Sequence, residues 1–365
     1  MNIKIHYIAD TILENKSAYS QHVVKMCDAF GLAGIKTILF IPFKSSKINY
    51  KRLKKFFLLR SKKPFDIKII RNKRIINFFD RILFGFFVAK YLKNEKKNLI
   101  LTRSLYASFF LSLFKVPHYL EIHSEIKSLT KFLMIYLNFI NSKYIVKKIL
   151  ISKALNKIFQ FKEKDIIILH DGVDIKNFKK IKKIKRPKIV SYVGSFYKGR
   201  GIEIILELAK KFPKLQFNLY GKKNSKLITN LRNVKIFDYI PYSKVPKILQ
   251  NSDILLMPHA NEVEGRAKNI NISDYCSPLK MFDYLAAGKI ILSSKKDGIC
   301  EILKHQKNSI IVNRYDIEEW SKEINKVLKK KYDLFSIQKK AIKTAKNYTW
   351  LKRANIILKN MALNS

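Results

Sequence analysis

The stretch SPLKMFDYLAAGKIILSS, residues 277–294, has the pattern of a capped helix followed by a buried strand. Ser277 stands where a helix N-cap is expected, Pro278 suits the first turn, and Gly288 suits the left-handed residue that ends a helix. The apolar run over residues 289–292 is typical of a strand in a parallel sheet. The stretch therefore predicts an α/β fold in which this helix covers a parallel sheet.

The predicted helix has two different faces. Met281, Phe282 and Leu285 share one face, which we expect to pack in the core. Lys280 and Asp283 lie on another face, near a helix N-terminus whose free backbone N–H groups can bind a phosphate. A capped, half-buried helix without an anion site is the alternative that these residues leave open.

Strands and helices alternate along the whole chain, which predicts an α/β protein with two doubly wound parallel sheets, each Rossmann-like. We place the N-terminal domain at residues 1–177, a charged linker at 178–188 and the C-terminal domain at 189–347. The predicted strands are 3–10, 36–42, 98–102, 118–122, 166–169, 189–193, 217–220, 234–237, 254–257 and 289–292. The longer predicted helices are 74–93, one or two over 129–151, 202–212, 316–329, 336–347 and 350–359.

The composition indicates a folded protein with room for two domains. The chain has 365 residues, of which 47% are hydrophobic and 12% aromatic, and this balance excludes a largely disordered chain. The three cysteines are widely spaced, which fits a reducing compartment. Residues 1–10 predict a strand and not a signal peptide, and the apolar runs are too short to cross a bilayer. We therefore expect a cytoplasmic protein.

Positive charge is concentrated in one region of the chain. The formal net charge is +47, and residues 44–97 hold 18 Lys and Arg against 3 Asp and Glu, interleaved with Phe and Leu. Within this region, residues 74–93 predict an apolar helix, either pressed on the sheet or half-immersed in a membrane surface. Such a region suits an anionic membrane surface or nucleic acid. A solvated basic face in a Lys-rich chain is the alternative.

Polar side chains follow several strands of the N-terminal half. Ser17 lies in the loop after the first strand, and Arg103 follows the strand 98–102. Glu121 and His123 stand at the end of the strand 118–122. Because ligands bind at the carboxyl ends of parallel strands, these four residues are candidates for a site. The alternative is that His123 has a purely structural role.

Several stretches carry a resemblance to one enzyme family. In the C-terminal half they are SYVGSFYKGRGIEIILELA (191–209), FNLYG (217–221), NVKIFDYIPYSKVPKILQNSDILLMP (233–258), residues 277–294 and YTWLKRA (348–354). The N-terminal half adds TRS (102–104), YLEIHSE (119–125) and HDGVD (170–174). Together they resemble the GT-B glycosyltransferases, specifically the retaining family called glycosyl transferases group 1. The resemblance implies two domains that face a cleft, with the C-terminal helix, residues 348–362, packed back on the N-terminal domain.

The resemblance also implies roles for single residues. Arg200 and Gly201 match the family's diphosphate clamp, where a guanidinium can offset the charge of the leaving group. Asp283 matches the second acid of the E-x7-E motif and is expected to hold the donor ribose. His123 matches the N-domain histidine beside the donor sugar, so His123, Arg200 and Asp283 are the candidate catalytic residues. Further donor-binding residues are Ser277, the backbone N–H groups of Leu279 and Lys280, and, along the base, Tyr239 and Ile240. Ser17, Arg103 and Glu121 are placed on the acceptor side.

Two positions depart from the family pattern. Ser195 stands where the family has an arginine, and Lys198 is the expected replacement for that charge. Tyr275 stands where the motif has its first acid. The sequence contains no Asp-x-Asp and no metal triad, so we expect activity without a metal or other cofactor.

The resemblance implies a retaining, hexosyltransferase-type enzyme. It would move a sugar from a nucleotide-sugar donor to a glycan or lipid-linked acceptor in bacterial surface polysaccharide synthesis, at the inner face of the cell membrane. One alternative is a non-hydrolysing sugar-nucleotide epimerase of the same fold, against which Tyr275 argues. The other is a basic, non-enzymatic nucleic-acid-binding protein; no nucleic-acid-binding motif is seen, so we expect no nucleic-acid partner.

Overall fold

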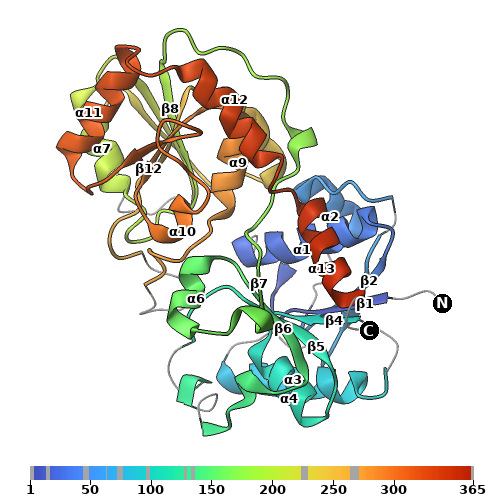
Figure 1. The fold of residues 1–365 in the computed structure, drawn as a ribbon. Helices are drawn as coiled ribbons and strands as arrows, with labels where there is room; N and C mark the ends of the chain where they lie inside the picture. Colours follow the sequence, from blue (N-terminus) through green and yellow to red (C-terminus); the bar gives the residue numbers. More distant parts are fainter. Residues whose placement is uncertain are drawn as a thin grey trace. The chain divides into compact units, whose positions relative to one another are not determined.

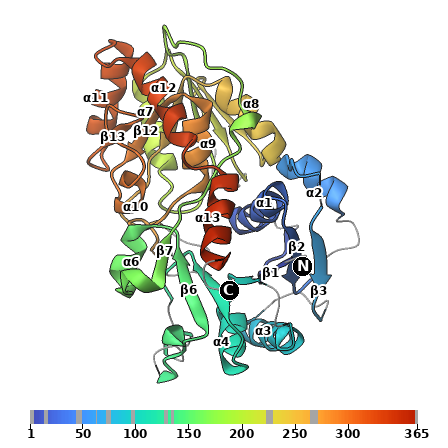
Figure 2. The same ribbon diagram turned by 45° about the vertical axis from the view of Figure 1, so that its right-hand side comes forward.

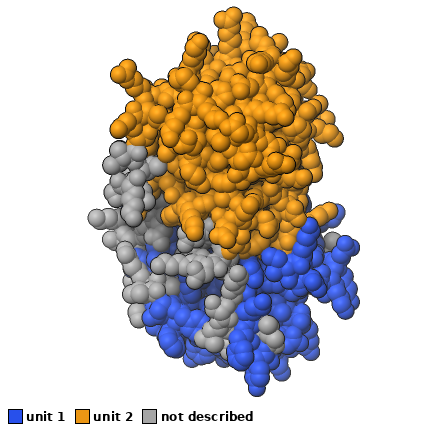
Figure 3. Space-filling model, turned by 90° about the vertical axis from the view of Figure 1, so that its left-hand side faces the viewer, with its two compact units in different colours: residues 1–151, 156–170, 350–365 blue, residues 152–155, 171–349 orange. Residues whose placement is uncertain are grey.

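The computed structural model describes residues 4–13, 17–43, 49–62, 64–71, 77–95, 99–126, 130–132, 136–222, 229–263 and 271–362. The chain forms two compact units (Figure 3). Unit 1 comprises residues 1–151, 156–170 and 350–365, and unit 2 comprises residues 152–155 and 171–349. Residues 178–188, for which the sequence predicts a linker, lie within unit 2, and the last helix returns to unit 1.

Unit 1 is built on a parallel sheet. Its described strands run in the order β3-β2-β1-β4-β5-β6-β7, and every neighbouring pair is parallel. The connection from β3 to β4 places β4 beside β1 and so reverses the direction in which strands are added, as in a doubly wound fold. The strands are β1 (Lys4–Ile8), β2 (Lys36–Ile41), β3 (Asp66–Ile69), β4 (Leu99–Thr102), β5 (His118–Ile122), β6 (Ile145–Leu150) and β7 (Ile166–Ile168).

Helices cover both faces of this sheet (Figures 1 and 2). Helices α3 and α4 lie on one face, where Phe84, Val88 and Leu111 join a buried apolar cluster with strand residues. Helices α1 and α13 pack beside each other on the other face, although they come from opposite ends of the chain. The helices of this region are α1 (Ala18–Leu32), α2 (Tyr50–Phe57), α3 (Phe78–Leu92), α4 (Leu105–Leu113), α6 (Lys153–Phe159) and α13 (Trp350–Ala362).

Unit 2 has a second parallel sheet, in the strand order β10-β9-β8-β11-β12-β13 among its described residues. One cluster of buried apolar side chains in its core includes Tyr192, Phe217 and Trp320. The strands are β8 (Ile189–Val193), β9 (Gln216–Tyr220), β10 (Val234–Phe237), β11 (Ile254–Met257), β12 (Ile290–Ser294) and β13 (Ile310–Val312). The helices are α7 (Ile202–Lys211), α8 (Val245–Gln250), α9 (Leu279–Ala287), α10 (Asp297–Cys300), α11 (Ile317–Leu328) and α12 (Leu334–Ala345).

The predicted α/β class with two parallel sheets is confirmed, and α9 is the helix predicted from residues 277–294. Met281, Phe282 and Leu285 are fully buried, as expected. Gly288 ends the helix with a positive φ of 60°, and a Cβ there would lie 2.4 Å from Ile181 Cγ2. Only glycine fits this position, because it needs both the left-handed conformation and the space.

Two predictions about local structure are wrong. The N-cap of α9 is Pro278 and not Ser277, so no side chain caps this helix and its first N–H groups receive no hydrogen bond from a cap side chain. Residues 145–150, expected to be helical, form strand β6 between β5 and β7. The run IVKKIL is short, with two lysines between apolar residues, and periodicity alone does not distinguish a strand from a helix at this length.

No helix in the described part of the chain is both long and apolar enough to cross a membrane.

Candidate functional site

The loop between β8 and α7, residues 194–201, owes its path to two glycines. Gly199 and Gly201 have positive φ angles of 79° and 72°. A Cβ on Gly199 would lie 1.9 Å from the Glu262 carbonyl oxygen, and one on Gly201 would lie 1.9 Å from the Pro258 carbonyl oxygen. The loop therefore lies directly against the segment that follows β11, and Arg200 between the glycines faces that segment.

Three basic side chains meet at this place. Arg200 Nη1 lies 3.4 Å from His259 Nε2. Lys280, in the first turn of α9, has its Nζ 4.0 Å from the centre of the Tyr192 ring. A Cβ on Gly194 would lie 2.6 Å from Lys280 Nζ, so the ammonium lies against the start of the loop. We call Arg200, His259 and Lys280 the basic cluster.

The ammonium of Lys280 is buried without an acceptor. Among the residues that the structure describes, none accepts a hydrogen bond from Lys280 Nζ. Burial, followed by the charge of Arg200, holds the pKa of Lys280 well below its ordinary value. Burial also lowers the pKa of His259 well below its usual range, and the charges of Arg200 and, to a smaller extent, Lys280 act in the same direction. A bound anion would relieve this repulsion and supply the missing acceptor oxygens, so the cluster has the chemistry of an anion site.

The structure places Lys280, and not Lys198, beside Arg200. Lys198, the expected replacement for the arginine missing at Ser195, is exposed to solvent, whereas Lys280 is in the basic cluster. Ser195 uses its backbone oxygen to accept a hydrogen bond of 2.7 Å from the Tyr192 hydroxyl. Sequence reasoning missed His259, although its position two residues after the buried strand β11 was a usable signal.

Asp283 lies one turn further along α9 from the basic cluster. Its carboxylate is buried and accepts a hydrogen bond of 2.8 Å from the Tyr242 hydroxyl. Burial and the charge of Asp283 raise the pKa of Tyr242 well above its ordinary value, so the phenol remains the donor. Ser277 and Tyr275 are also buried. Tyr239 is exposed and Ile240 is half-buried in the loop after β10; Leu279, half-buried, begins α9.

A second polar cluster lies in unit 1, around Glu121 on β5. Its Oε1 lies 3.0 Å from His123 Nε2 and 3.0 Å from His22 Nε2, and it accepts a hydrogen bond from Arg353 of α13. Its Oε2 accepts a hydrogen bond of 2.9 Å from the Tyr7 hydroxyl. Two helices and two strands thus hold one fully buried carboxylate in a fixed position.

The protonation states in this cluster follow from burial and charge. Burial alone would raise the pKa of Glu121, but the basic side chains around it, His22 and Arg353 foremost, hold that pKa well below its usual range. Burial, with Arg103 second, lowers the pKa of His123 to about 3 against the opposing effect of Glu121. His123 is therefore a neutral imidazole at neutral pH. If Nε2–H is donated to the carboxylate, Nδ1 is left as an acceptor.

The remaining candidates of unit 1 have clear local contacts. The Ser17 side chain caps α1 by accepting a hydrogen bond of 3.2 Å from the Ser20 backbone N–H. Arg103 places its guanidinium carbon 4.1 Å from the centre of the Tyr19 ring. Its charge also acts on His123, so the structure brings Arg103, Glu121 and His123 together, as the sequence predicts. His22 and Arg353 were missed, because neither stands at a strand end.

One group in the described chain has the spacing of metal ligands. The ligand atoms of His22, Glu121 and His123 lie within 4.8 Å of one another. The guanidinium of Arg353 shares the same carboxylate oxygen, and its positive charge opposes a second cation there. The residues therefore fit a hydrogen-bonded anchor better than a metal site. Activity without a metal stays a prediction.

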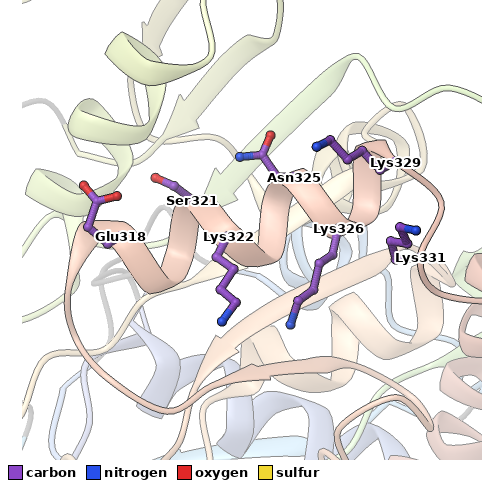
Figure 4. A pocket seen from close by; sticks show the side chains of 7 residues that line it. All are labelled: Glu318, Ser321, Lys322, Asn325, Lys326, Lys329 and Lys331. Atoms are coloured by element: carbon purple, nitrogen blue, oxygen red, sulfur yellow. The ribbon is translucent and has the colours of Figure 1, made fainter.

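A surface groove lies elsewhere in unit 2 (Figure 4). It runs along α11, has a volume of about 460 Å³, and is lined mainly by lysines. None of the residues predicted for the site lines it. Its lining residues are Glu318, Ser321, Lys322, Asn325, Lys326, Lys329 and Lys331.

Comparison with known families finds a match in the second half of the chain. Residues 173–348, which cover most of unit 2, match the model of the family Glycosyl transferases group 1. No curated protein matches the chain.

Solved structures resemble the whole chain at low sequence identity. A glycosyltransferase from Rickettsia africae ESF-5 has a TM-score of 0.75 at 14% identity, with 100% of both chains covered. HepE from Anabaena, solved in complex with UDP-glucose, has a TM-score of 0.72 at 14% identity, over 99% of this chain and 100% of that one. WaaG, a glycosyltransferase involved in lipopolysaccharide biosynthesis, has a TM-score of 0.65 at 12% identity, over 98% and 99%. The shared fold is the GT-B fold of two parallel-sheet α/β domains.

Proposed function

Because residues 173–348 match the model of the family Glycosyl transferases group 1, we propose that this protein is a retaining glycosyltransferase of hexosyltransferase type that uses a nucleotide-sugar donor. One observation carries the proposal: the buried ammonium of Lys280, without an acceptor, beside Arg200 and His259. A diphosphate is the part of a nucleotide sugar that needs such cations. The HepE structure with UDP-glucose supports a donor of this kind.

The basic cluster would act on the leaving group. As the bond between the sugar and the diphosphate breaks, negative charge grows on the phosphate oxygens. Preorganised cations therefore stabilise the transition state more than the ground state. Arg200 can bridge two oxygens, while Lys280 replaces the cation missing at Ser195. The first turn of α9 adds backbone N–H groups, those of Leu279 and Lys280 among them.

Other residues would position the donor. Asp283, oriented by Tyr242, would accept hydrogen bonds from the ribose hydroxyls. Tyr239 and Ile240 would line the base. His123, neutral and anchored by Glu121, would offer Nδ1 to a sugar hydroxyl.

We propose same-face attack by the acceptor hydroxyl, with the leaving phosphate taking its proton and no covalent enzyme intermediate. Two carboxylates in the candidate sites are already engaged: Glu121 by Arg353 and Tyr7, and Asp283 by Tyr242. A carboxylate held by such donors is a poor nucleophile, which favours a mechanism that depends on positioning and charge. No step requires a metal.

The acceptor would be a glycan or a lipid-linked glycan of a bacterial surface polysaccharide, with Ser17, Arg103 and Glu121 on the acceptor side. WaaG, which shares the fold, supports this assignment. The high net charge of +47 supports peripheral attachment to the anionic inner face of the cell membrane.

Turnover of a donor panel tests this function. Sugar nucleotides of the common bases are incubated with the protein and membrane extract, released nucleoside diphosphate is measured, and the anomer formed is read by proton NMR. We expect release from one donor or a few, with the anomeric configuration retained. Inversion would contradict the mechanism. Interconversion of the donor sugar without release would favour an epimerase.

We expect Asp283→Asn to raise the donor KM about tenfold with little change in kcat, because a ribose contact is made alike in the ground and transition states. Steady-state kinetics with varied donor measures both constants. Tyr242→Phe is the matched variant: it removes the hydroxyl that orients Asp283 and should raise the KM less. If Asp283→Asn leaves the donor KM unchanged, Asp283 is structural and the ribose is held elsewhere.

A further inference from the structure

Helix α3 is apolar on two sides. Phe84, Val88 and Leu92 point into the core of unit 1, as the buried face of any helix would. A second row follows at four-residue intervals, and its members are exposed by 70%, 39%, 40% and 44% of their surface: Phe79, Leu83, Phe87 and Tyr91. Residues four apart lie above one another on a helix, so these side chains form one continuous outward stripe.

Cations lie against the rings of this stripe. Lys68 of β3 places its Nζ 3.6 Å from the centre of the Tyr91 ring, and the Arg71 guanidinium carbon lies 5.6 Å from the centre of the Phe87 ring. Lys90 is exposed on the same side of α3. We call these residues together the α3 surface: Lys68, Arg71, Phe79, Leu83, Phe87, Lys90 and Tyr91.

Two nearby acids, Asp80 and Asp66, are engaged elsewhere. Asp80 is buried, and its carboxylate accepts a hydrogen bond from the Asn77 backbone N–H in the capping box of α3. Asp66 forms an ion pair of 2.9 Å with Lys36. The charge presented beside the stripe is therefore positive.

This combination indicates one kind of partner. A row of large apolar side chains is unfavourable in water and marks a surface that binds a partner. The flanking Lys and Arg side chains favour a partner with negative charge. Helix α3 has 15 residues, which is too short to span a bilayer but suits a helix that lies in the plane of its surface. We propose that the α3 surface docks on an anionic lipid bilayer, with the four apolar side chains between the headgroups and the cations on lipid phosphates.

This docking surface rests on the peripheral membrane attachment proposed above, for which it names the residues, but it does not depend on sugar transfer. The test uses no sugar donor, so its result can be interpreted even if the protein transfers no sugar.

Sedimentation with vesicles tests it. The full chain is mixed with vesicles of equal parts phosphatidylglycerol and phosphatidylcholine, or of phosphatidylcholine alone, and the pelleted fraction gives a partition constant. We expect binding to the anionic vesicles only, with release at about 0.5 M salt as screening shortens the reach of the charges. The variant Phe79→Ser/Leu83→Ser/Phe87→Ser should lower the partition constant at least about tenfold.

The matched control is Leu351→Ser/Ile356→Ser, which removes apolar side chains of α13 that are exposed to a similar extent. It should bind as the wild type does, and circular dichroism checks that both variants are folded. An α3 variant that is folded and binds like the wild type would overturn the proposal. So would equal binding to neutral vesicles, or no binding of the wild type to either.

Discussion

We expect Arg200→Ala to lower kcat at least about a hundredfold, equivalent to about 2–4 kcal/mol of lost transition-state stabilisation. The guanidinium lies 3.4 Å from His259 in a loop whose two glycines fix its path. Its charge-assisted hydrogen bonds to the diphosphate would strengthen as the leaving group becomes negative. The effect should therefore appear in kcat and not only in the donor KM.

Steady-state assays of the wild type and the variant measure this effect. The control is Arg232→Ala, which removes an exposed arginine from the same unit without touching the basic cluster. It should stay within about twofold of the wild type. A kcat for Arg200→Ala within threefold of the wild-type value would remove Arg200 from the catalytic machinery.

The second large effect is on stability. We expect Arg353→Met to lower the free energy of unfolding by about 3–5 kcal/mol, because it leaves the buried Glu121 carboxylate without its cation. Arg353 also donates hydrogen bonds to the backbone oxygens of Leu169 and His170, the latter at 2.9 Å, and so fixes α13 in unit 1. Urea denaturation followed by circular dichroism measures the change.

The pH dependence of this effect has a definite sign. Because the folded pKa of Glu121 is depressed, the pair contributes its full stability above the ordinary glutamate pKa and loses it as pH falls through the folded value. The difference between Arg353→Met and the wild type should therefore shrink in acid. Lys352→Met, next to it but exposed, is the control. A change below about 1 kcal/mol for Arg353→Met would mean that the pair is not a structural anchor.

The sequence predicted those parts of the fold that depend on residues close together in the chain. The helix and strand of residues 277–294 follow from the glycine that ends the helix and from the spacing of the apolar residues. Strands β8, β10 and β11 coincide with the strands predicted at 189–193, 234–237 and 254–257. Strand β6 was missed because such a short run fits helix and strand equally.

The candidate site depends more on contacts between distant residues. Arg353 and Glu121 are 232 positions apart, and no local pattern links them. The role of the Lys280 side chain was missed for a similar reason: only the folded loop shows that its ammonium, and not that of Lys198, lies beside Arg200. The outward stripe of α3 likewise needed the structure, since the sequence left open whether residues 74–93 pack on the sheet or meet a membrane.

We expect the basic cluster to hold a nucleoside diphosphate. Titration calorimetry with UDP, GDP, ADP, CDP and TDP, and with their nucleosides, tests this binding. At least one diphosphate should bind and its nucleoside should bind far more weakly. Because the pKa of Lys280 is depressed in the free protein and a bound anion raises it, binding should be accompanied by proton uptake at Lys280 and should weaken as pH rises.

Runs in two buffers of different ionisation enthalpy give the number of protons taken up. In Lys280→Met, affinity should fall at least about tenfold and the uptake assigned to Lys280 should disappear. If no diphosphate binds the wild type, or if nucleosides bind as tightly as diphosphates, the basic cluster is not a donor site.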